Sequence, residues 1–241
     1  MKLIRILKEL RLKYCLSHSY VRVCRNSQLT IGKGCLVKHC NIRVGDKSKL
    51  IIKDNARLEN VSIYIENGTF HIGASSWLSG KRYDKSQYII NNGDVTINHH
   101  SKSMVKRLWV RFGGKVGIGC YTNINAGTEI RSDEAVHIGD FCQISYNVRI
   151  WDTNTHCLYS SAKRREIAKK YWPYYGFETE RPKTSPITIG NDCWIGEDAS
   201  ILKGSIIGDE VTVGYRTTVA GKYIPPQNTV VLVIDYKIIQ R

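Results

Sequence analysis

His156 has the residue type and the position that most favour acid–base chemistry in this chain. It follows Asp152 by four residues, at the start of a stretch that runs from 151 to 186 and reads WDTNTHCLYSSAKRREIAKKYWPYYGFETERPKTSP. A neutral imidazole removes a proton from a hydroxyl group near pH 7, so His156 is a candidate general base. The other histidines fall in the N-terminal region or between repeats. The pair His99–His100 has no third ligand at a suitable spacing, so no metal site is predicted.

The composition favours an anionic partner. The chain has 241 residues and a formal charge of +15, which suits nucleic acid, acidic lipid, phosphorylated cofactors or an acidic polysaccharide. Part of this charge lies in the 151–186 stretch, where seven Lys or Arg stand against three Glu between residues 163 and 183. Aromatic residues are interleaved with them, at Tyr171, Trp172, Tyr174, Tyr175 and Phe177.

The cysteines and the N-terminal segment indicate the cellular compartment of the protein. The eight cysteines form no CxxC pair, so we expect reduced thiols and a cytoplasmic protein. Charges interrupt every apolar run of MKLIRILKELRLKYC, which predicts neither a cleavable signal nor a membrane span. The segment favours a short amphipathic helix. That helix either packs on the end of the next domain or lies on an acidic membrane surface.

An aliphatic residue at every sixth position marks the C-terminal half of the chain. The series runs without a gap through Ile189, Ile195, Ile201, Ile207, Val213 and Val219. Neither an α-helix nor an ordinary strand has this period, whereas a triangular coil with three short sides does. We therefore expect a parallel β-helix, in which each aliphatic side chain points inward and stacks on its equivalent about 4.8 Å along the axis. An ordinary β-sandwich of many short strands is the alternative.

The repeat extends into the N-terminal half in a looser form. One isoleucine per coil is expected at Ile31, Ile52, Ile72, Ile97, Ile118, Ile138, Ile189 and Ile207. The step from Ile138 to Ile189 is 51 residues, so part of the chain must leave the helix there as an inserted loop. The predicted division is an N-terminal helical or irregular segment (1–26), a β-helix domain (27–222) with an inserted loop (151–186), and a C-terminal tail packed on the helix (223–241).

Three segments together resemble the hexapeptide-repeat acyltransferases. They are IGNDCWIGEDASILKGSIIGDEVTVG (189–214), YIPPQNTVV (223–231) and ISYNVRIWDTNTH (144–156). The branch that the chain most resembles contains the O-acetyltransferases of capsular and lipopolysaccharide sugars, with maltose and galactoside acetyltransferases as relatives. The resemblance implies an all-β, left-handed parallel β-helix. It also implies a homotrimer with acetyl-CoA bound in clefts between neighbouring helices.

The resemblance also implies roles for individual residues. His156 matches the family's general base, and Trp194 matches the tryptophan beside the acceptor and the thioester. Asn123 and Asn125 match a polar pair that lines the acceptor pocket, and Asp152 matches an aspartate found before the histidine in many capsule enzymes. Contacts to coenzyme A are expected from Glu197, Tyr215, Ala220, Lys222 and Lys237. In one departure, LVIDYK (232–237) replaces the family's Gly-Asn-Pro-Ala-Lys run near the adenine and keeps only the lysine.

The expected reaction is direct transfer of an acetyl group from acetyl-CoA to a sugar hydroxyl, with His156 as the base, Asp152 orienting the imidazole and no metal. A covalent acyl-enzyme on Cys157 is the alternative route, and nothing in the sequence marks that thiol as activated. The basic, aromatic loop then suits an acidic acceptor such as a sialic-acid-containing capsule chain, unless its rings only pack the loop onto the helix.

Several alternatives stay open at this point. Trp194 also fits a cap on a coil interface, and the two asparagines also fit an inward-facing ladder. The acceptor could be an antibiotic or a free sugar. The chain could also be a non-catalytic β-helix that binds an acidic polymer, although no nucleic-acid module is visible.

Overall fold

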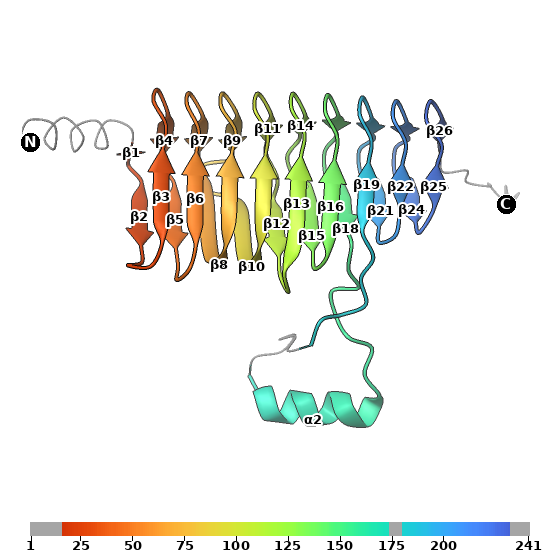
Figure 1. Ribbon diagram of the computed structural model, residues 1–241. Coiled ribbons are helices and arrows are strands. Elements are labelled where there is room, and N and C mark those ends of the chain that lie inside the picture. The colour runs from red at the N-terminus through yellow and green to blue at the C-terminus, as the bar shows by residue number, and fades with distance from the viewer. Residues whose placement is uncertain (1–15, 174–179, 232–241) are drawn as a thin grey trace, which may run out of the picture.

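The computed structural model describes residues 16–173 and 180–231, which form one parallel β-solenoid with one helix in its insertion (Figure 1). Short strands follow one another around three faces, and each strand pairs in parallel with a strand of the next coil. The all-β class and the parallel coil expected from the period of six are therefore confirmed, and the β-sandwich is wrong.

The strands of each face are as follows. Face one is a ten-stranded sheet made of β1 (Leu16–Ser17), β4 (Leu36–Lys38), β7 (Arg57–Glu59), β9 (Trp77–Ser79), β11 (Lys102–Ser103), β14 (Asn123–Ile124), β17 (Gln143–Ile144), β20 (Trp194–Ile195), β23 (Thr212–Val213) and β26 (Thr229–Val230). Face two holds β2 (Tyr20–Val23), β5 (Asn41–Val44), β12 (Arg107–Val110), β15 (Glu129–Ser132), β18 (Arg149–Trp151), β21 (Ser200–Leu202) and β24 (Thr218–Ala220). Face three holds β3 (Gln28–Ile31), β6 (Lys49–Ile52), β13 (Gly114–Ile118), β16 (Ala135–Ile138), β19 (Ile187–Ile189), β22 (Ile206–Ile207) and β25 (Tyr223–Ile224). The long strands β8 (Val61–Ile72) and β10 (Ser86–Ile97) run through the corner between faces two and three, so these faces form one 16-stranded sheet.

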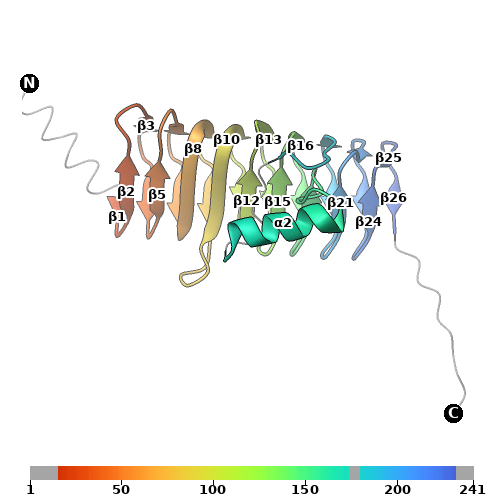
Figure 2. The same ribbon diagram turned by 90° about the horizontal axis from the view of Figure 1, so that it is seen from below.

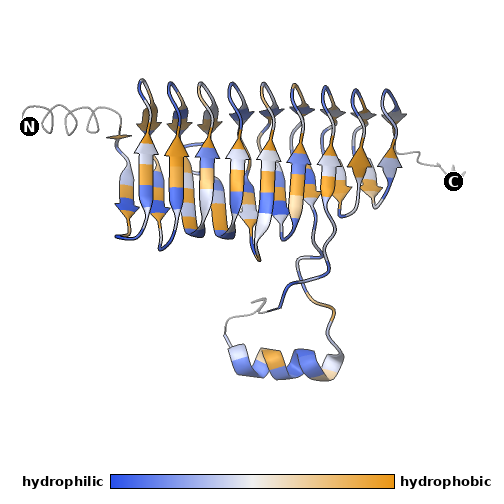
Figure 3. Ribbon diagram, viewed as in Figure 1, coloured by the Kyte–Doolittle hydropathy of each residue, from blue (hydrophilic) through white to orange (hydrophobic). Residues whose placement is uncertain are grey.

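The isoleucines predicted to be equivalent do pair coil by coil. The register runs from Ile31 opposite Ile52 through to Ile189 opposite Ile207, and Ile224 extends it by one coil. From Ile52 to Ile207 each of these side chains is at most 1% exposed. Burial of an isoleucine stabilises a fold by about 1.5–3 kcal/mol, so this inward ladder is a main source of stability. Figure 3 shows the resulting alternation of hydrophobic and hydrophilic residues along the strands.

The glycine that follows the inward residue serves close approach between coils. A Cβ atom built on Gly196 would lie 2.8 Å from the carbonyl carbon of Gly214, one coil away, so any side chain there would clash with backbone. The left-handed conformation is instead taken two residues later, at Asp198 (φ 58°). Position 196 therefore needs glycine because of packing, and the turn itself accepts other residues.

The solenoid is longer than the predicted domain (27–222) in both directions. Before residue 27, β1 and β2 already pair with β4 and β5. After residue 222, β25 and β26 add most of another coil. The N-terminal strands lack the strict hexad, and their inward residues, such as Leu16 and Val21, are only partly buried in the first described coil. The helix predicted in the first segment lies outside the described residues.

The insertion leaves face two after β18 and returns at β19, close to the predicted bounds of 151–186. It contains one helix that the sequence reading did not predict, α2 (Ser161–Tyr171). The Ser160 hydroxyl caps it by accepting a hydrogen bond from the Lys163 N–H at 3.3 Å, and two lysines occupy its last turn. None of its residues is buried, and it stands off the solenoid below faces two and three (Figures 1 and 2).

Candidate active site

His156 lies on the neck of the insertion, with its side chain exposed. The neck is closed by hydrogen bonds between its two ends, because Thr153 and Thr184 form an antiparallel bridge and the Asn154 N–H donates to the Lys183 carbonyl at 3.0 Å. The His156 N–H donates to the Asn154 carbonyl at 2.7 Å in a tight turn. The candidate base is therefore carried on an anchored segment rather than on a free loop.

Asp152 has a different place from the one that the sequence suggested. Its side chain is fully buried, and its carboxylate accepts hydrogen bonds from the Ser132 hydroxyl (2.8 Å) and from the N–H groups of Asp133 (2.8 Å) and Glu134 (3.0 Å). Burial raises the pKa of this carboxyl above its ordinary value. These donors occupy both carboxylate oxygens, so Asp152 ties the insertion to the previous coil and does not face an acceptor. Its assignment to the acceptor site is wrong for this reason.

A buried ion pair that the sequence reading missed lies under the neck. The guanidinium of Arg111 binds both carboxylate oxygens of Asp133, at 2.9 and 2.8 Å, and Asp133 is 1% exposed. The Thr153 hydroxyl donates to the same carboxylate at 2.6 Å. Bidentate geometry and a third donor compensate the cost of burying these charges. The start of the insertion is thus attached to a rigid ion pair.

Three of the predicted site residues do lie together on face one. Trp194, 59% exposed, and Asn125 line one pocket of about 400 Å³ with Gln143. The Asn123 amide donates to Asn125 at 3.2 Å and to Gln143 at 3.5 Å. Gln143 pairs with Asn123 on one side and with Trp194 on the other, so the register of face one itself places the indole beside the amides. We call Asn123, Asn125, Gln143 and Trp194 the face-one cluster.

Two of the expected coenzyme A contacts lie at the next corner, between faces one and two. Glu197 and Tyr215 occupy neighbouring rungs of this corner, where the Arg216 N–H donates to the Glu197 carbonyl at 2.9 Å. Glu197 lines a pocket of about 520 Å³ together with Lys81, Lys106 and Tyr146. The two lysines could meet phosphate groups, although Asp84 and Glu197 in the same lining balance their charge.

The remaining expected contacts do not join that group. Ala220 ends β24 and Lys222 follows it, both exposed at the corner between faces two and three. That is also the corner at which the insertion leaves, because Ser185 at its end accepts a hydrogen bond from the Gly204 N–H at 3.1 Å. Lys237 lies outside the described residues.

The predicted base and the face-one cluster occupy opposite sides of the solenoid. His156 belongs to the corner between faces two and three, and Trp194 belongs to face one, which lies across the three-sided cross-section from that corner. The buried ladder of aliphatic side chains separates the two. A single chain therefore carries both halves of the predicted site without bringing them together.

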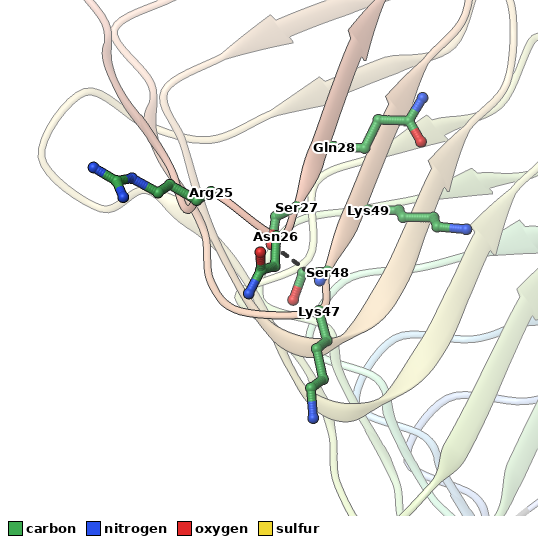
Figure 4. Close-up of a pocket in the computed structure, with 7 residues that line it drawn as sticks. All are labelled: Arg25, Asn26, Ser27, Gln28, Lys47, Ser48 and Lys49. Carbon is green, nitrogen blue, oxygen red and sulfur yellow. Dashed lines mark hydrogen bonds between the residues drawn. The ribbon is translucent and has the colours of Figure 1, made fainter.

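A third pocket, of about 490 Å³, lies at the N-terminal end of the solenoid. Arg25, Lys47 and Lys49 line it with small polar residues, and their side chains point in different directions (Figure 4). Residues 20–53 carry one acidic residue, Asp46, against a set of exposed cations: Arg22, Arg25, Lys33, Lys38, Arg43, Lys47, Lys49 and Lys53. Divergent cations fit an extended anionic surface better than a small ligand.

Comparison with known proteins identifies the family. Residues 186–221 match the family model described as Bacterial transferase hexapeptide (six repeats). The chain is also 30% identical over 155 residues to WbbJ of Escherichia coli strain K12, assigned to lipopolysaccharide biosynthesis as an O-acetyl transferase, and the match covers 64% of this chain and 75% of WbbJ. The chain belongs to the hexapeptide-repeat acyltransferases.

Two further proteins are similar to this hexapeptide-repeat acyltransferase. Galactoside O-acetyltransferase of the same organism is 32% identical over 119 residues, which are 49% of this chain and 51% of that protein. The crystal structure of NeuO, a polySia-specific acetyltransferase, shares the fold with a TM-score of 0.50 and 21% identity, over 92% of this chain and 85% of NeuO. The expected left-handed β-helix is confirmed, and the chain is an acetyltransferase of this family. Within the described residues, no helix is long and apolar enough to cross a bilayer.

The sequence predicted the exposed residues of the candidate site and missed the buried residues beneath the neck. Gln143 could have been found, because it lies 20 residues after Asn123 and 51 before Trp194, the same steps that separate the isoleucines of those coils. Arg111 and Asp133 gave no comparable signal. Their pairing depends on how the corner before each coil is folded, and charged residues are usually exposed.

Proposed function

We propose that this acyltransferase moves an acetyl group from acetyl-CoA to a hydroxyl group of a sugar in a surface glycan, with His156 as the general base. The observation that carries the proposal is the exposed imidazole on an anchored neck, in a chain 30% identical to an O-acetyl transferase assigned to lipopolysaccharide biosynthesis. A capsular polysaccharide or an O-antigen is the acceptor class that follows.

The reaction requires His156 alone for proton transfer. The neutral imidazole takes the hydroxyl proton while the sugar oxygen forms a bond to the thioester carbonyl carbon. The tetrahedral oxyanion then collapses, the carbon–sulfur bond breaks, and coenzyme A leaves as a thiol with the proton returned by the imidazolium. A backbone N–H of the neighbouring coil would stabilise the oxyanion. Holding both substrates in reacting positions accounts for much of the acceleration.

An acidic acceptor agrees with the charge of α2. Its cations are Lys163, Arg164, Arg165, Lys169 and Lys170, against one carboxylate, Glu166. All of these side chains are exposed, and the helix stands in solvent next to the neck that carries His156. Such a helix can bind carboxylates along a sugar chain such as one containing sialic acid, with the exposed Trp172 packing on a ring face.

A homotrimer would complete the site. Because His156 and Trp194 lie on opposite sides of one solenoid, a neighbouring copy has to present its face-one cluster to the neck. Cyclic symmetry then makes identical sites between neighbouring copies. The exposed Glu197 and Tyr215 rungs and Lys222 would contact the pantetheine arm and phosphates of acetyl-CoA in these clefts.

The N-terminal end suits contact with the inner face of an acidic membrane, which would keep this cytoplasmic enzyme near lipid-linked glycans. The exposed cations of residues 20–53 support this location, and the preceding segment adds five more cations and one Glu. Each cation close to an anionic bilayer contributes about 1 kcal/mol of attraction.

The test is release of coenzyme A thiol by the purified enzyme, with sialylated polymer, neutral glycan, free sugars and an antibiotic panel as acceptors. We expect acceptor-dependent release that falls about 10³-fold in His156→Ala, because general-base catalysis contributes on this order. His137→Ala, which removes an exposed histidine from face three, is the control.

Each outcome decides between functions. Release with polymer that His156→Ala abolishes supports the glycan proposal. Release with a small molecule alone moves the acceptor to that class. Release that is unchanged in His156→Ala contradicts the role of this residue as the base. A protein that binds acidic polymer but releases no thiol with any acceptor is a binding protein rather than a transferase.

A further inference from the structure

The residue before His156 has an unusual backbone conformation. Thr155 adopts φ 68°, in the left-handed region, and it is the one β-branched residue among the non-glycine residues with positive φ in the described part of the chain. Most of the others are polar or aromatic residues at regular corners. A β-branched side chain is strained there, because its Cβ substituents crowd the backbone. Strain of this kind persists only where surrounding contacts hold it, and such residues gather at functional sites.

Every polar group of Thr155 is held by a neighbour. Its N–H donates to the Thr153 hydroxyl at 3.0 Å, its carbonyl accepts from the Arg111 guanidinium at 3.2 Å, and its hydroxyl accepts from Arg131 at 3.2 Å. Thr155 is 7% exposed, so these bonds are shielded from water. We call Arg111, Arg131, Thr153 and Thr155 the Thr155 clamp.

The two arginines are themselves immobilised. Arg111 is paired with buried Asp133, which also binds Thr153, so one carboxylate sets both ends of the turn. Arg131 binds Glu129 at 3.0 Å, and its guanidinium lies 4.2 Å from the ring centre of Trp151. Fixed cations of this kind give a fixed direction to the groups that they bind.

We propose that the Thr155 clamp positions the imidazole of His156 for proton transfer, a role that the sequence reading gave to Asp152. This inference rests on the proposed function of His156. The clamp fixes the backbone from which the His156 side chain extends, because the carbonyl of Thr155 belongs to the peptide bond that joins the two residues. The strained turn directs the imidazole, and the buried Arg111–Asp133 pair supplies the rigidity. Thr155 is a positioning residue and does not touch the substrate.

Three substitutions of Thr155 separate positioning from stability. Thr155→Gly relieves the strain but loses the bond to Arg131 and loosens the unfolded chain, so its unfolding temperature should stay within a few degrees of that of the wild type, while kcat falls about 10- to 100-fold and both KM values stay within about twofold. Thr155→Ser keeps the hydroxyl bond to Arg131 and should keep kcat within about threefold. Thr155→Val loses that bond and should resemble the glycine variant in kcat. Lys47→Gly, at another left-handed residue (φ 50°) on a distant corner, is the control for strain relief alone.

A second measurement keeps the inference separate from the proposed function. The NMR contacts of the His156 ring with its neighbours should change in Thr155→Gly and stay as in the wild type in Thr155→Ser, whether or not an acceptor has been found. Unchanged ring contacts and unchanged kcat in Thr155→Gly would overturn the inference. Changed ring contacts together with full activity of His156→Ala would keep the clamp and reject the base.

Discussion

The neck of the insertion and the face-one cluster hold the two halves of the predicted site in opposite ways. On the neck, the polar groups that support His156 are buried, with Asp152 and Asp133 at most 1% exposed. In the face-one cluster, Trp194 is 59% exposed and the amides bind mainly one another. The polar groups of the neck are therefore satisfied within one chain. The face-one cluster is an open surface, and its partners must come from a ligand or from another chain.

The difference has a physical cause. Buried carboxylates are tolerated only when several donors hold them, and this requirement leaves one geometry for the neck. An exposed indole and exposed amides are hydrated at little cost in free energy. They contribute binding free energy when a ligand or a second chain displaces this water. The backbone that carries the candidate base is thus preorganised, and the face-one cluster is left adaptable.

The sharpest test of this comparison mixes two variants that are each impaired in activity. His156→Ala chains keep the face-one cluster, and Trp194→Ala chains keep the base. If each site combines the neck of one copy with the cluster of the next, an equal, randomly assembled mixture of trimers should regain about a quarter of wild-type activity. About three quarters of these trimers contain both variants, and each of them has one intact site of three. Activity is measured by thiol release after co-refolding or co-expression.

The same experiment can also show that the two halves of the predicted site act within one chain. Activity no higher than that of the separate variants, in oligomers shown by mass spectrometry to be mixed, would mean that both residues act within one chain. Mixing His156→Ala with Thr155→Gly is the control, since both changes affect the neck and no rescue is expected.

A single substitution of Trp194 should have a smaller effect than loss of the base. Trp194→Ala is expected to lower kcat/KM for the acceptor about 10- to 100-fold, because an aromatic contact worth about 1–3 kcal/mol is lost. Trp77 lies on the same ladder of face one, four rungs earlier, with 38% of its surface exposed. Trp77→Ala should leave kcat/KM unchanged, and an equal loss in both variants would argue for a general effect on the fold.

The smallest expected effect is that of a substitution at Asp152, and it is measured as a change in the free energy of unfolding. Asp152→Asn should lower the free energy of unfolding by about 1–3 kcal/mol, because an amide cannot accept from all three donors. Burial raises the pKa of Asp152, so the folded protein binds this proton more tightly than the unfolded chain. The contribution of Asp152 is then larger at low pH and is reduced as pH rises through its folded-state pKa.

Denaturant unfolding at several pH values measures whether the contribution of Asp152 to stability rises or falls with pH. The stability difference between wild type and Asp152→Asn should widen from pH 7 toward about pH 4, where the variant has no carboxyl to protonate. Asp46→Asn, at an exposed corner, is the control and should give no such trend. A difference that narrows on acidification would show that the native environment favours the ionised form.

Most of the fold was predictable because the solenoid is built from local repetition. Each hexad places one aliphatic residue inward, so the register from Ile31 to Ile207 could be written down from the sequence. The ends were less predictable. Leu16 and Val21 are partly buried in the first described coil, where no earlier coil among the described residues covers them and the pattern is relaxed. The helix α2 had recognisable signals in Ser160 and the lysines of its last turn, yet no apolar stripe marked it.

The candidate site divides in the same way. His156, Trp194, Asn123 and Asn125 could be proposed from the sequence because they occupy marked positions in the repeat and match a family pattern. Asp152 was assigned the wrong role, because sequence proximity to His156 does not reveal where a carboxylate points. The isolated spacing of Arg111 and Asp133 carried no information either, although the structure joins them in the best-buried ion pair beside the neck.

The sequence by itself determined the period, the inward register and the place at which the chain leaves the solenoid, because each of these depends on local hydrophobic order. Only the tertiary structure decided which polar groups are buried together, that Thr155 takes a strained conformation, and that His156 and Trp194 lie on opposite sides of one chain. These features arise from contacts between coils, where the free energy of a buried charge depends on donors supplied by distant parts of the sequence.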